Sequence, residues 1–191
     1  MQHLRIPGWF FALTLAATFA ATAATVPPVP AFSARYQLLR NGSPIGEATL
    51  TLGKDKNGAW TFTTTSKGTS GLAGLLGATT HEASVFHWVD NLPQCDSYDY
   101  SLNTAVKQQH RTVHCDWNRH VIEVDDKGKH AFASKPGTLE RHTVPLALAA
   151  GLAAGKNKFD LPVAVRDRVE IQHYAAQGKA TLHVPAGTCR V

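Results

Sequence analysis

Two of the three cysteines are spaced so that they predict a covalent link. Cys95 and Cys115 bound a stretch that is typical of two strands joined by a turn at its midpoint. Residues directly opposed in an antiparallel pair are close enough for a disulfide, so we expect Cys95 to bond Cys115. The same register places Asp99 opposite Arg111 as a cross-strand pair of opposite charge. Cys189, near the chain end, is then left without a partner.

Ten histidines raise the question of a metal site. In a strand only residues i and i+2 can easily chelate one ion, and the sequence contains no His-x-His. A site assembled from different strands, for example His87, His114 and Asp116, is the alternative that stays open. Histidines scattered over β-surfaces usually face solvent. We therefore expect no metal ion, and we expect no other cofactor.

The glycine-rich segment 68–77 (GTSGLAGLLG) matches no catalytic loop. A phosphate-binding loop needs a lysine after its last glycine, and this segment has none. A hydrolase elbow needs Gly-x-Ser-x-Gly, but Leu72 occupies the fifth position around Ser70. The sequence therefore identifies no catalytic residue. The segment is a flexible apolar connector or a short helix, and it either packs on the core or forms a mobile lid over an apolar cavity.

The first residues predict export. One basic residue, a 12-residue apolar run over 9–20 and the small residues Ala21-Thr22-Ala23 are typical of a secretory signal peptide. The run is shorter than the ~20 residues that a transmembrane helix needs, so we expect no transmembrane segment in the mature chain. We expect a signal peptide over 1–23, a Pro-rich spacer over 24–31 and a single β-rich domain over 32–191. The expected location is the periplasm, where disulfides persist.

The charge pattern argues against nucleic acid as a partner. Lys and Arg number 19 and Asp and Glu 14, a net charge of +5. The basic residues are scattered among turn-forming residues, whereas a nucleic-acid-binding protein concentrates them on one face. The net charge therefore suggests no more than a weak attraction to anionic surfaces.

Alternation of apolar and polar residues predicts a chain made mostly of strands. Strand-like segments, with alternating, β-branched or aromatic residues, are separated from one another by turn residues. They cover residues 32–38, 45–52, 60–66, 80–89, 95–117, 121–124, 131–133, 163–174 and 180–184. Pro145 to Ala154 is apolar nearly all round and predicts one buried helix. The expected fold is mainly β, a strongly curved antiparallel sheet or open β-barrel with one buried apolar helix.

Several short motifs follow one another in a recognisable order. They are Phe32-x-Ala-x-Tyr36, Asn41-Gly42, Gly46-Glu47-Ala48, Ser84-x-Phe86, the tyrosines before the hairpin turn, Asp116-Trp117 and Val184-Pro185-Ala186-Gly187-Thr188. In this order they resemble an exported bacterial family, the domain of unknown function 3108. The resemblance implies a β-rich protein of the Gram-negative envelope with no established activity. It also implies that the domain is truncated after Val191, since similar sequences continue with further strands. This chain departs from them at Thr143-Val144-Pro145 and at Cys189.

Three classes of function remain. A non-enzymatic binding module for a lipid or other apolar ligand ranks first, because a sheet with a helix and a Gly/Leu connector can enclose an apolar cavity. A cell-envelope assembly or protein-interaction module ranks second, because open sheets offer edge strands for pairing. An enzyme ranks third. The candidate ligand lining is Phe62, Leu72, Leu75, Leu76, Phe86, Trp88, Leu146 and Leu148.

Overall fold

The computed structural model describes residues 26–184 and 186–190. The expected signal peptide, residues 1–23, lies outside the described residues, as do the first two residues of the expected spacer. The chain is mainly β, with 59% of residues in strands and 9% in helices, which confirms the expected class. The described residues contain a large antiparallel sheet and two helices but no closed barrel, and the strong curvature stays a prediction.

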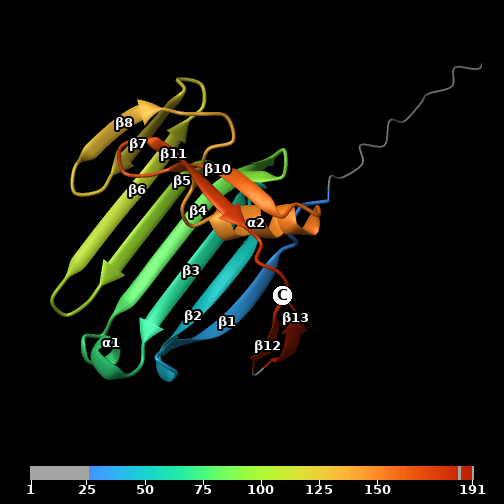
Figure 1. Ribbon diagram of the computed structural model, residues 1–191. Helices are drawn as coiled ribbons and strands as arrows, with labels where there is room; N and C mark the ends of the chain where they lie inside the picture. Colours follow the sequence, from blue (N-terminus) through green and yellow to red (C-terminus); the bar gives the residue numbers. More distant parts are fainter. Residues whose placement is uncertain (1–25, 185, 191) are drawn as a thin grey trace, which may run out of the picture.

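Eight antiparallel strands form the large sheet (Figure 1). They lie in the order β1 to β8, so each strand pairs with its neighbours in sequence and the sheet is one continuous meander. The strands are β1 (Phe32–Arg40), β2 (Ser43–Lys54), β3 (Trp60–Gly68), β4 (Thr79–Val89), β5 (Leu92–Asn103), β6 (Gln108–Asp116), β7 (Val121–Asp125) and β8 (Lys129–Ala133). The glycine-rich segment between β3 and β4 contains the short helix α1 (Gly71–Leu75).

A helix and a smaller sheet cover part of one face of the large sheet (Figure 1). Helix α2 (Val144–Ala153) is the expected apolar helix, and the small sheet holds β9 (Leu139–Glu140), β10 (Lys158–Ala164) and β11 (Val169–Ala175). A separate hairpin, β12 (Thr181–Val184) and β13 (Gly187–Arg190), follows and carries the exposed Cys189. Neither α1 nor α2, the helices of the described residues, has the length and apolar character needed to cross a bilayer.

Three clusters of buried residues form the core, and two of them join the large sheet to the covering layer. One combines Leu52, Phe62 and Phe86 of the large sheet with Leu146 of α2. The second combines Cys95, Tyr98, Val113, Cys115, Ile122 and Val124 of the large sheet with Ala164 of β10. The third lies inside the covering layer and consists of Leu139, Val144, Ala147, Phe159, Leu161 and Val163. Alternate residues such as Val113 and Cys115 of β6 and Ile122 and Val124 of β7 are thus buried in this core or at its edge, as a period of two predicts.

The register of the β5–β6 hairpin differs from the expected one by one residue. Asp99 pairs with Thr112 and not with Arg111, so the expected charge pair is wrong. A register shift between β4 and β5 falls near Asp96, which alters the alternation of inward and outward side chains in β5. Cys95 and Tyr98 therefore both point into the core, although residues three positions apart in a regular strand face opposite sides of the sheet.

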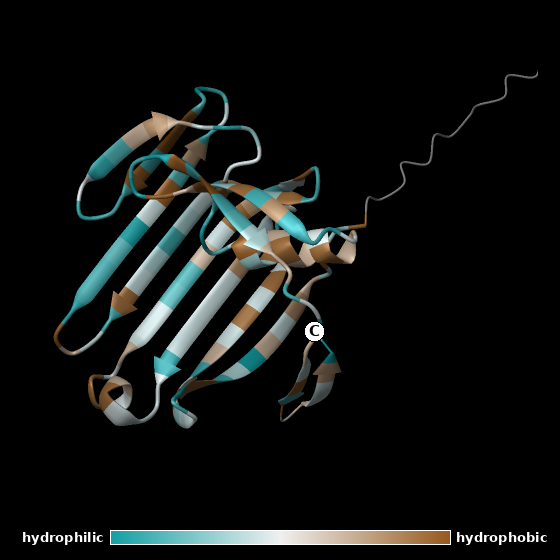
Figure 2. Cartoon of the chain, viewed as in Figure 1, coloured by the Kyte–Doolittle hydropathy of each residue, from teal (hydrophilic) through white to brown (hydrophobic). Residues whose placement is uncertain are grey.

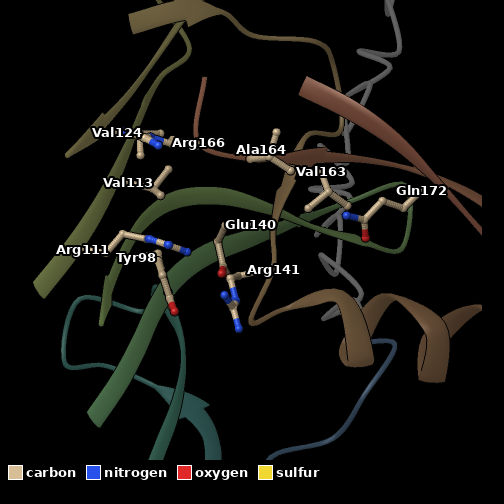
Figure 3. A pocket seen from close by; sticks show the side chains of 11 residues that line it. Tyr98, Arg111, Val113, Val124, Glu140, Arg141, Val163, Ala164, Arg166 and Gln172 are labelled. Carbon is tan, nitrogen blue, oxygen red and sulfur yellow. The ribbon is translucent and has the colours of Figure 1, made fainter. Parts of the chain in front are cut away.

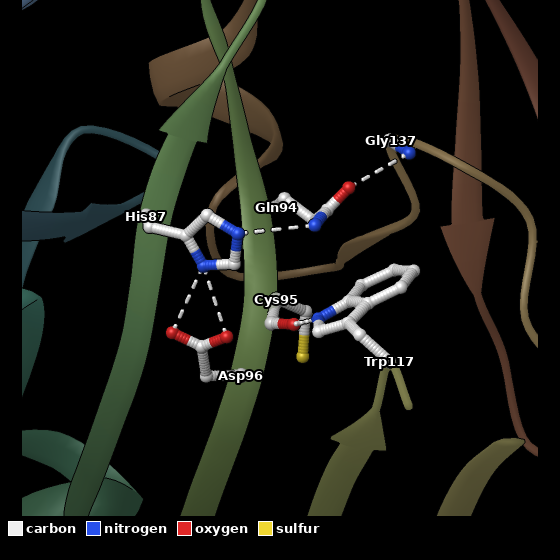
Figure 4. A network of polar contacts seen from close by, with 6 residues as sticks. All are labelled: His87, Gln94, Cys95, Asp96, Trp117 and Gly137. Atoms are coloured by element: carbon white, nitrogen blue, oxygen red, sulfur yellow. Dashed lines mark hydrogen bonds and ion pairs between the residues drawn. The ribbon is translucent and has the colours of Figure 1, made fainter. Parts of the chain in front are cut away.

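The two core cysteines are neighbours but are not bonded in this structure. Cys95 and Cys115 approach to 2.8 Å, which is longer than an S–S bond of about 2.05 Å, and both are free thiols. Figure 4 shows what holds Cys95 in place: the indole N–H of Trp117 donates to the Cys95 carbonyl over 2.8 Å. The backbone N–H of Cys95 donates to the carbonyl of Thr138 over 3.1 Å.

We expect Leu75→Asp to leave the stability of the fold almost unchanged. Leu75 lies in α1 with most of its side chain exposed, so the new carboxylate stays hydrated. The matched control is Leu146→Asp, which places a carboxylate in the core beside Phe62 and Phe86 and should cost several kcal/mol. Thermal unfolding measures both, and a large drop in the melting temperature of Leu75→Asp would show that α1 is part of the core.

Candidate functional site

A cavity lies between the large sheet and the small sheet (Figure 3). Its volume is about 280 Å³. Strands β5, β6 and β7 supply one wall, and β9, β10, β11 and the residues after β10 supply the other. The lining residues are Tyr98, Arg111, Val113, Val124, Glu140, Arg141, Val163, Ala164, Val165, Arg166 and Gln172.

The lining has an apolar part and a cationic part, and it also includes Tyr98, Gln172 and the carboxylate of Glu140. Val113, Val124 and Val163 are buried and belong to the core clusters on both sides. Arg141 and Arg166 are exposed, so their guanidinium groups lie where the cavity meets solvent. The site therefore offers apolar contacts inside and positive charge at its mouth, an arrangement suited to an amphiphile with a negative group.

A third arginine lines the cavity from β6. Arg111 forms an ion pair with Asp126, whose side chain is 8% exposed. The Nε of Arg111 and the Oδ1 of Asp126 are buried and have no hydrogen-bond partner among the described residues. Buried polar atoms nearly always have partners. Arg111 therefore reaches the cavity wall as half of an ion pair, with its Nε buried.

Glu140 is a buried carboxylate at the base of the site. Its Oε1 accepts hydrogen bonds from the Ser84 hydroxyl (2.8 Å) and the backbone N–H of Thr143 (3.0 Å). Its Oε2 accepts one from the backbone N–H of His142 at 2.7 Å. Burial raises the pKa of Glu140 to about 6, although these hydrogen bonds lower it. The carboxylate thus fixes the backbone that enters α2.

His142 continues this network toward β3. Since Ser84 donates its single proton to Glu140, the His142 Nδ1 at 2.7 Å must be the donor to the Ser84 oxygen. The Nε2 of His142 then accepts from the Thr64 hydroxyl at 2.8 Å. The ring stacks on Phe62 with 4.4 Å between centroids. Burial lowers the pKa of His142 to about 4, so the ring is neutral at pH 7.

The serine, histidine and glutamate of this network are not arranged as a nucleophile and its base. Ser84 is 1% exposed, so a substrate cannot reach its oxygen. Its proton is directed to Glu140 and not to His142, whereas a catalytic serine must give its proton to the histidine. The hydrogen bonds of this network connect β3 and β4 to the start of α2.

The structure does not bring the expected ligand lining together. Phe62, Phe86 and Leu146 pack against one another in the core, and Trp88 packs beside them. Leu148 packs in a different cluster. Leu72 and Leu75 are exposed on α1, and Leu76 is half-buried there. These eight residues therefore do not line one common cavity, because the connector is at one end of the sheet and α2 at the other (Figure 1).

The histidines form no metal site in the part of the chain that the structure describes. Both ring nitrogens of His87 are engaged, as Figure 4 shows: Nδ1 lies 3.0 Å from Asp96, and Nε2 lies 3.1 Å from the amide nitrogen of Gln94. The Gln94 oxygen in turn accepts from the backbone N–H of Gly137. Asp116, the carboxylate of the assembled site considered above, pairs with Arg119.

Sequence patterns did not identify Glu140, His142 or the three cavity arginines. One local signal existed. Glu140 lies three residues before Thr143, where α2 begins, and carboxylates are favoured beside the free N–H groups of a helix start. The partnership with Ser84 had no such signal, because 56 residues separate the two positions.

Glu140 and His142 predict opposite effects of pH on stability. The folded protein raises the pKa of Glu140 from 4.5 to about 6. The contribution of Glu140 to the free energy of unfolding is therefore complete below pH 4.5 and is lost as pH rises through about 6. It lowers the pKa of His142 from 6.5 to about 4, so that contribution is present above pH 6.5 and is lost as pH falls through about 4. In the wild-type protein the two trends oppose each other.

Two variants separate these trends. Relative to the wild type, Glu140→Gln should gain about 2 kcal/mol of stability as pH rises from well below 4.5 to well above 6. His142→Gln should lose about 3 kcal/mol relative to the wild type as pH rises from 4 to 6.5. Urea denaturation at closely spaced pH values measures both differences. Differences that stay constant with pH would contradict the protonation states given above.

Comparison with known proteins found no matching family model, no matching curated protein and no matching solved structure. The resemblance to the domain of unknown function 3108 therefore stays a prediction.

Proposed function

We propose that this protein is a periplasmic, non-enzymatic binding module for a lipid or other apolar ligand that carries an anionic group. The supporting observation is the cavity between β5–β7 and β9–β11, with buried valines inside and arginines at its mouth. Arginine presents planar donors that match carboxylates and phosphates, and valines contact a hydrocarbon chain. The proposed site replaces the lining expected from the sequence.

The size of the cavity restricts the ligand. Sites for drug-sized molecules have volumes of about 300–1,000 Å³. The observed volume of about 280 Å³ is just below the lower end of this range. The cavity therefore takes one short acyl chain, or one part of a larger lipid whose remainder stays outside. Arg111 adds a guanidinium to the lining from β6, where it is paired with Asp126.

The expected binding selectivity follows from the charges at the mouth. Dodecanoate should bind, whereas dodecylammonium, which has the same chain length and the opposite charge, should not. Arg141→Gln should weaken dodecanoate binding about tenfold, because hydrogen bonds to charged groups contribute about 1.5–3 kcal/mol. Isothermal titration calorimetry measures these affinities.

The matched control is Arg119→Gln, which removes an exposed arginine that pairs with Asp116 outside the cavity. Its dodecanoate affinity should equal that of the wild type. Equal affinities for dodecanoate and dodecylammonium would contradict the site. Absence of any bound amphiphile, together with a stable pull-down partner from the envelope, would favour the envelope-interaction alternative instead.

The exported form should contain a Cys95–Cys115 disulfide. The hydrogen bond with Cys115, together with burial, raises the pKa of Cys95, so this thiol stays protonated until an oxidant acts. A thiol–disulfide oxidoreductase would take up the two electrons as its own disulfide becomes a dithiol, and the two cysteines would release two protons. The bond closes a loop of about 20 residues and should add about 3 kcal/mol.

Peptide mapping of the non-reduced protein after export tests this bond. The peptides that contain Cys95 and Cys115 should be recovered linked. Recovery of either one linked to Cys189, or of both as free thiols, would contradict the prediction.

A further inference from the structure

Three connections lie together at the end of the large sheet that is farther from α2 (Figure 1). We call them the distal end: the β1–β2 turn with its flanks (38–45), the segment around α1 (66–80) and the β5–β6 turn with its flanks (101–109). Backbone hydrogen bonds join them. The N–H of Thr69 donates to the Ile45 carbonyl over 3.0 Å, and the N–H of Ala105 donates to the Leu76 carbonyl over 2.9 Å.

Each of the three segments exposes large apolar side chains. Leu39 is 57% exposed, Leu72 66%, Leu75 82% and Val106 78%. Figure 2 shows the hydrophobic colour at α1 and at the β5–β6 turn. Single exposed apolar residues are common, but a group at one end of a fold marks an interaction surface.

The same three segments carry only positive charge. Each contains one basic residue, Arg40, Lys67 or Lys107, and none contains an aspartate or a glutamate. All three basic residues are exposed. Arg40 directly follows Leu39, and Lys107 directly follows Val106. Two of the segments therefore place a cation directly after an exposed apolar side chain, and in the third Lys67 precedes α1 and stands opposite Glu47 of β2.

The helix in the middle segment is held against the sheet. The hydroxyl of Ser70 donates to the carbonyl of Pro44, and α1 contacts both β2 and β3. A side chain at Gly74 would meet the backbone of Thr69 at 2.8 Å, so glycine permits this close packing. Leu72 and Leu75 are therefore presented outward by a packed turn of helix.

We propose that the distal end binds the surface of an anionic phospholipid membrane. Leucine and valine side chains insert at the boundary between headgroups and acyl chains, and nearby cations attract anionic headgroups. A second copy of the chain fits this surface less well, because two distal ends would bring like charges together. The surface is separate from the cavity, so either proposal can fail without the other.

Vesicle flotation tests the proposal with the complete 191-residue chain. The wild type should bind vesicles of phosphatidylcholine and phosphatidylglycerol much more tightly than vesicles of phosphatidylcholine alone. The triple variant Arg40→Gln, Lys67→Gln, Lys107→Gln should lose about fivefold in affinity per cation removed. The double variant Leu72→Ser, Leu75→Ser should lose at least about tenfold, since binding scales with inserted apolar area.

Two control variants carry equivalent changes elsewhere on the surface. Lys127→Gln, Lys129→Gln, Lys156→Gln makes the same change in net charge, and Leu152→Ser, Ile171→Ser removes two other exposed apolar side chains. Both should bind vesicles as the wild type does. All variants keep residues 1–23, so the contribution of the apolar run at 9–20 is common to every comparison.

Hydrogen exchange with and without the anionic vesicles localises the contact. Protection should appear in the three distal segments. Protection elsewhere, equal binding to both kinds of vesicle, or distal variants that bind like the controls would each overturn the proposal. So would concentration-dependent dimerisation that the distal substitutions abolish while vesicle binding is unchanged.

Discussion

The buried carboxylate of Glu140 is the interaction on which the arrangement of the layers depends. Removing a carboxylate from water is costly unless hydrogen-bond donors replace the lost hydration. Here Ser84 supplies one donor from β4, and the backbone of His142 and Thr143 supplies two. The two backbone donors are local to Glu140, but the Ser84 donor is in place only when β9 and the start of α2 lie on the large sheet. The need to satisfy one charge therefore fixes the position of the covering layer.

The cavity is a consequence of the same arrangement. Because Glu140 is fixed and β9 pairs with β10, the next residue, Arg141, lies at the rim and Val163 lies opposite the sheet. The covering layer does not touch the sheet everywhere between β5 and β11, and the space that remains is the proposed binding site. The hydrogen bonds of Glu140 thus position the covering layer so that an apolar cavity remains beneath it.

Much of the fold could be predicted because its signals are local. Alternation identified most strands, and the apolar run from Pro145 identified α2 to within one residue at each end. The exact register was not predictable, since the irregularity near Asp96 changes which face each side chain of β5 occupies. The site was missed because Ser84, Glu140 and Arg111 come from three separate parts of the chain. Leu75 was assigned to a cavity because its sequence context shows that it is apolar but not that it is exposed.

The sequential order of the eight strands also bears on how the chain folds. Each strand of the meander pairs with the strand before and after it in sequence, so every hairpin closes a short loop. Short loops lose little chain entropy on closure, and domains rich in such contacts fold faster than other β-proteins of similar size. The hydrogen bond between Ser84 and Glu140 joins residues 56 positions apart. It becomes favourable only after β4 and the start of α2 have both formed. We therefore expect the large sheet to assemble strand by strand and the docking of the covering layer to be the slower, long-range step.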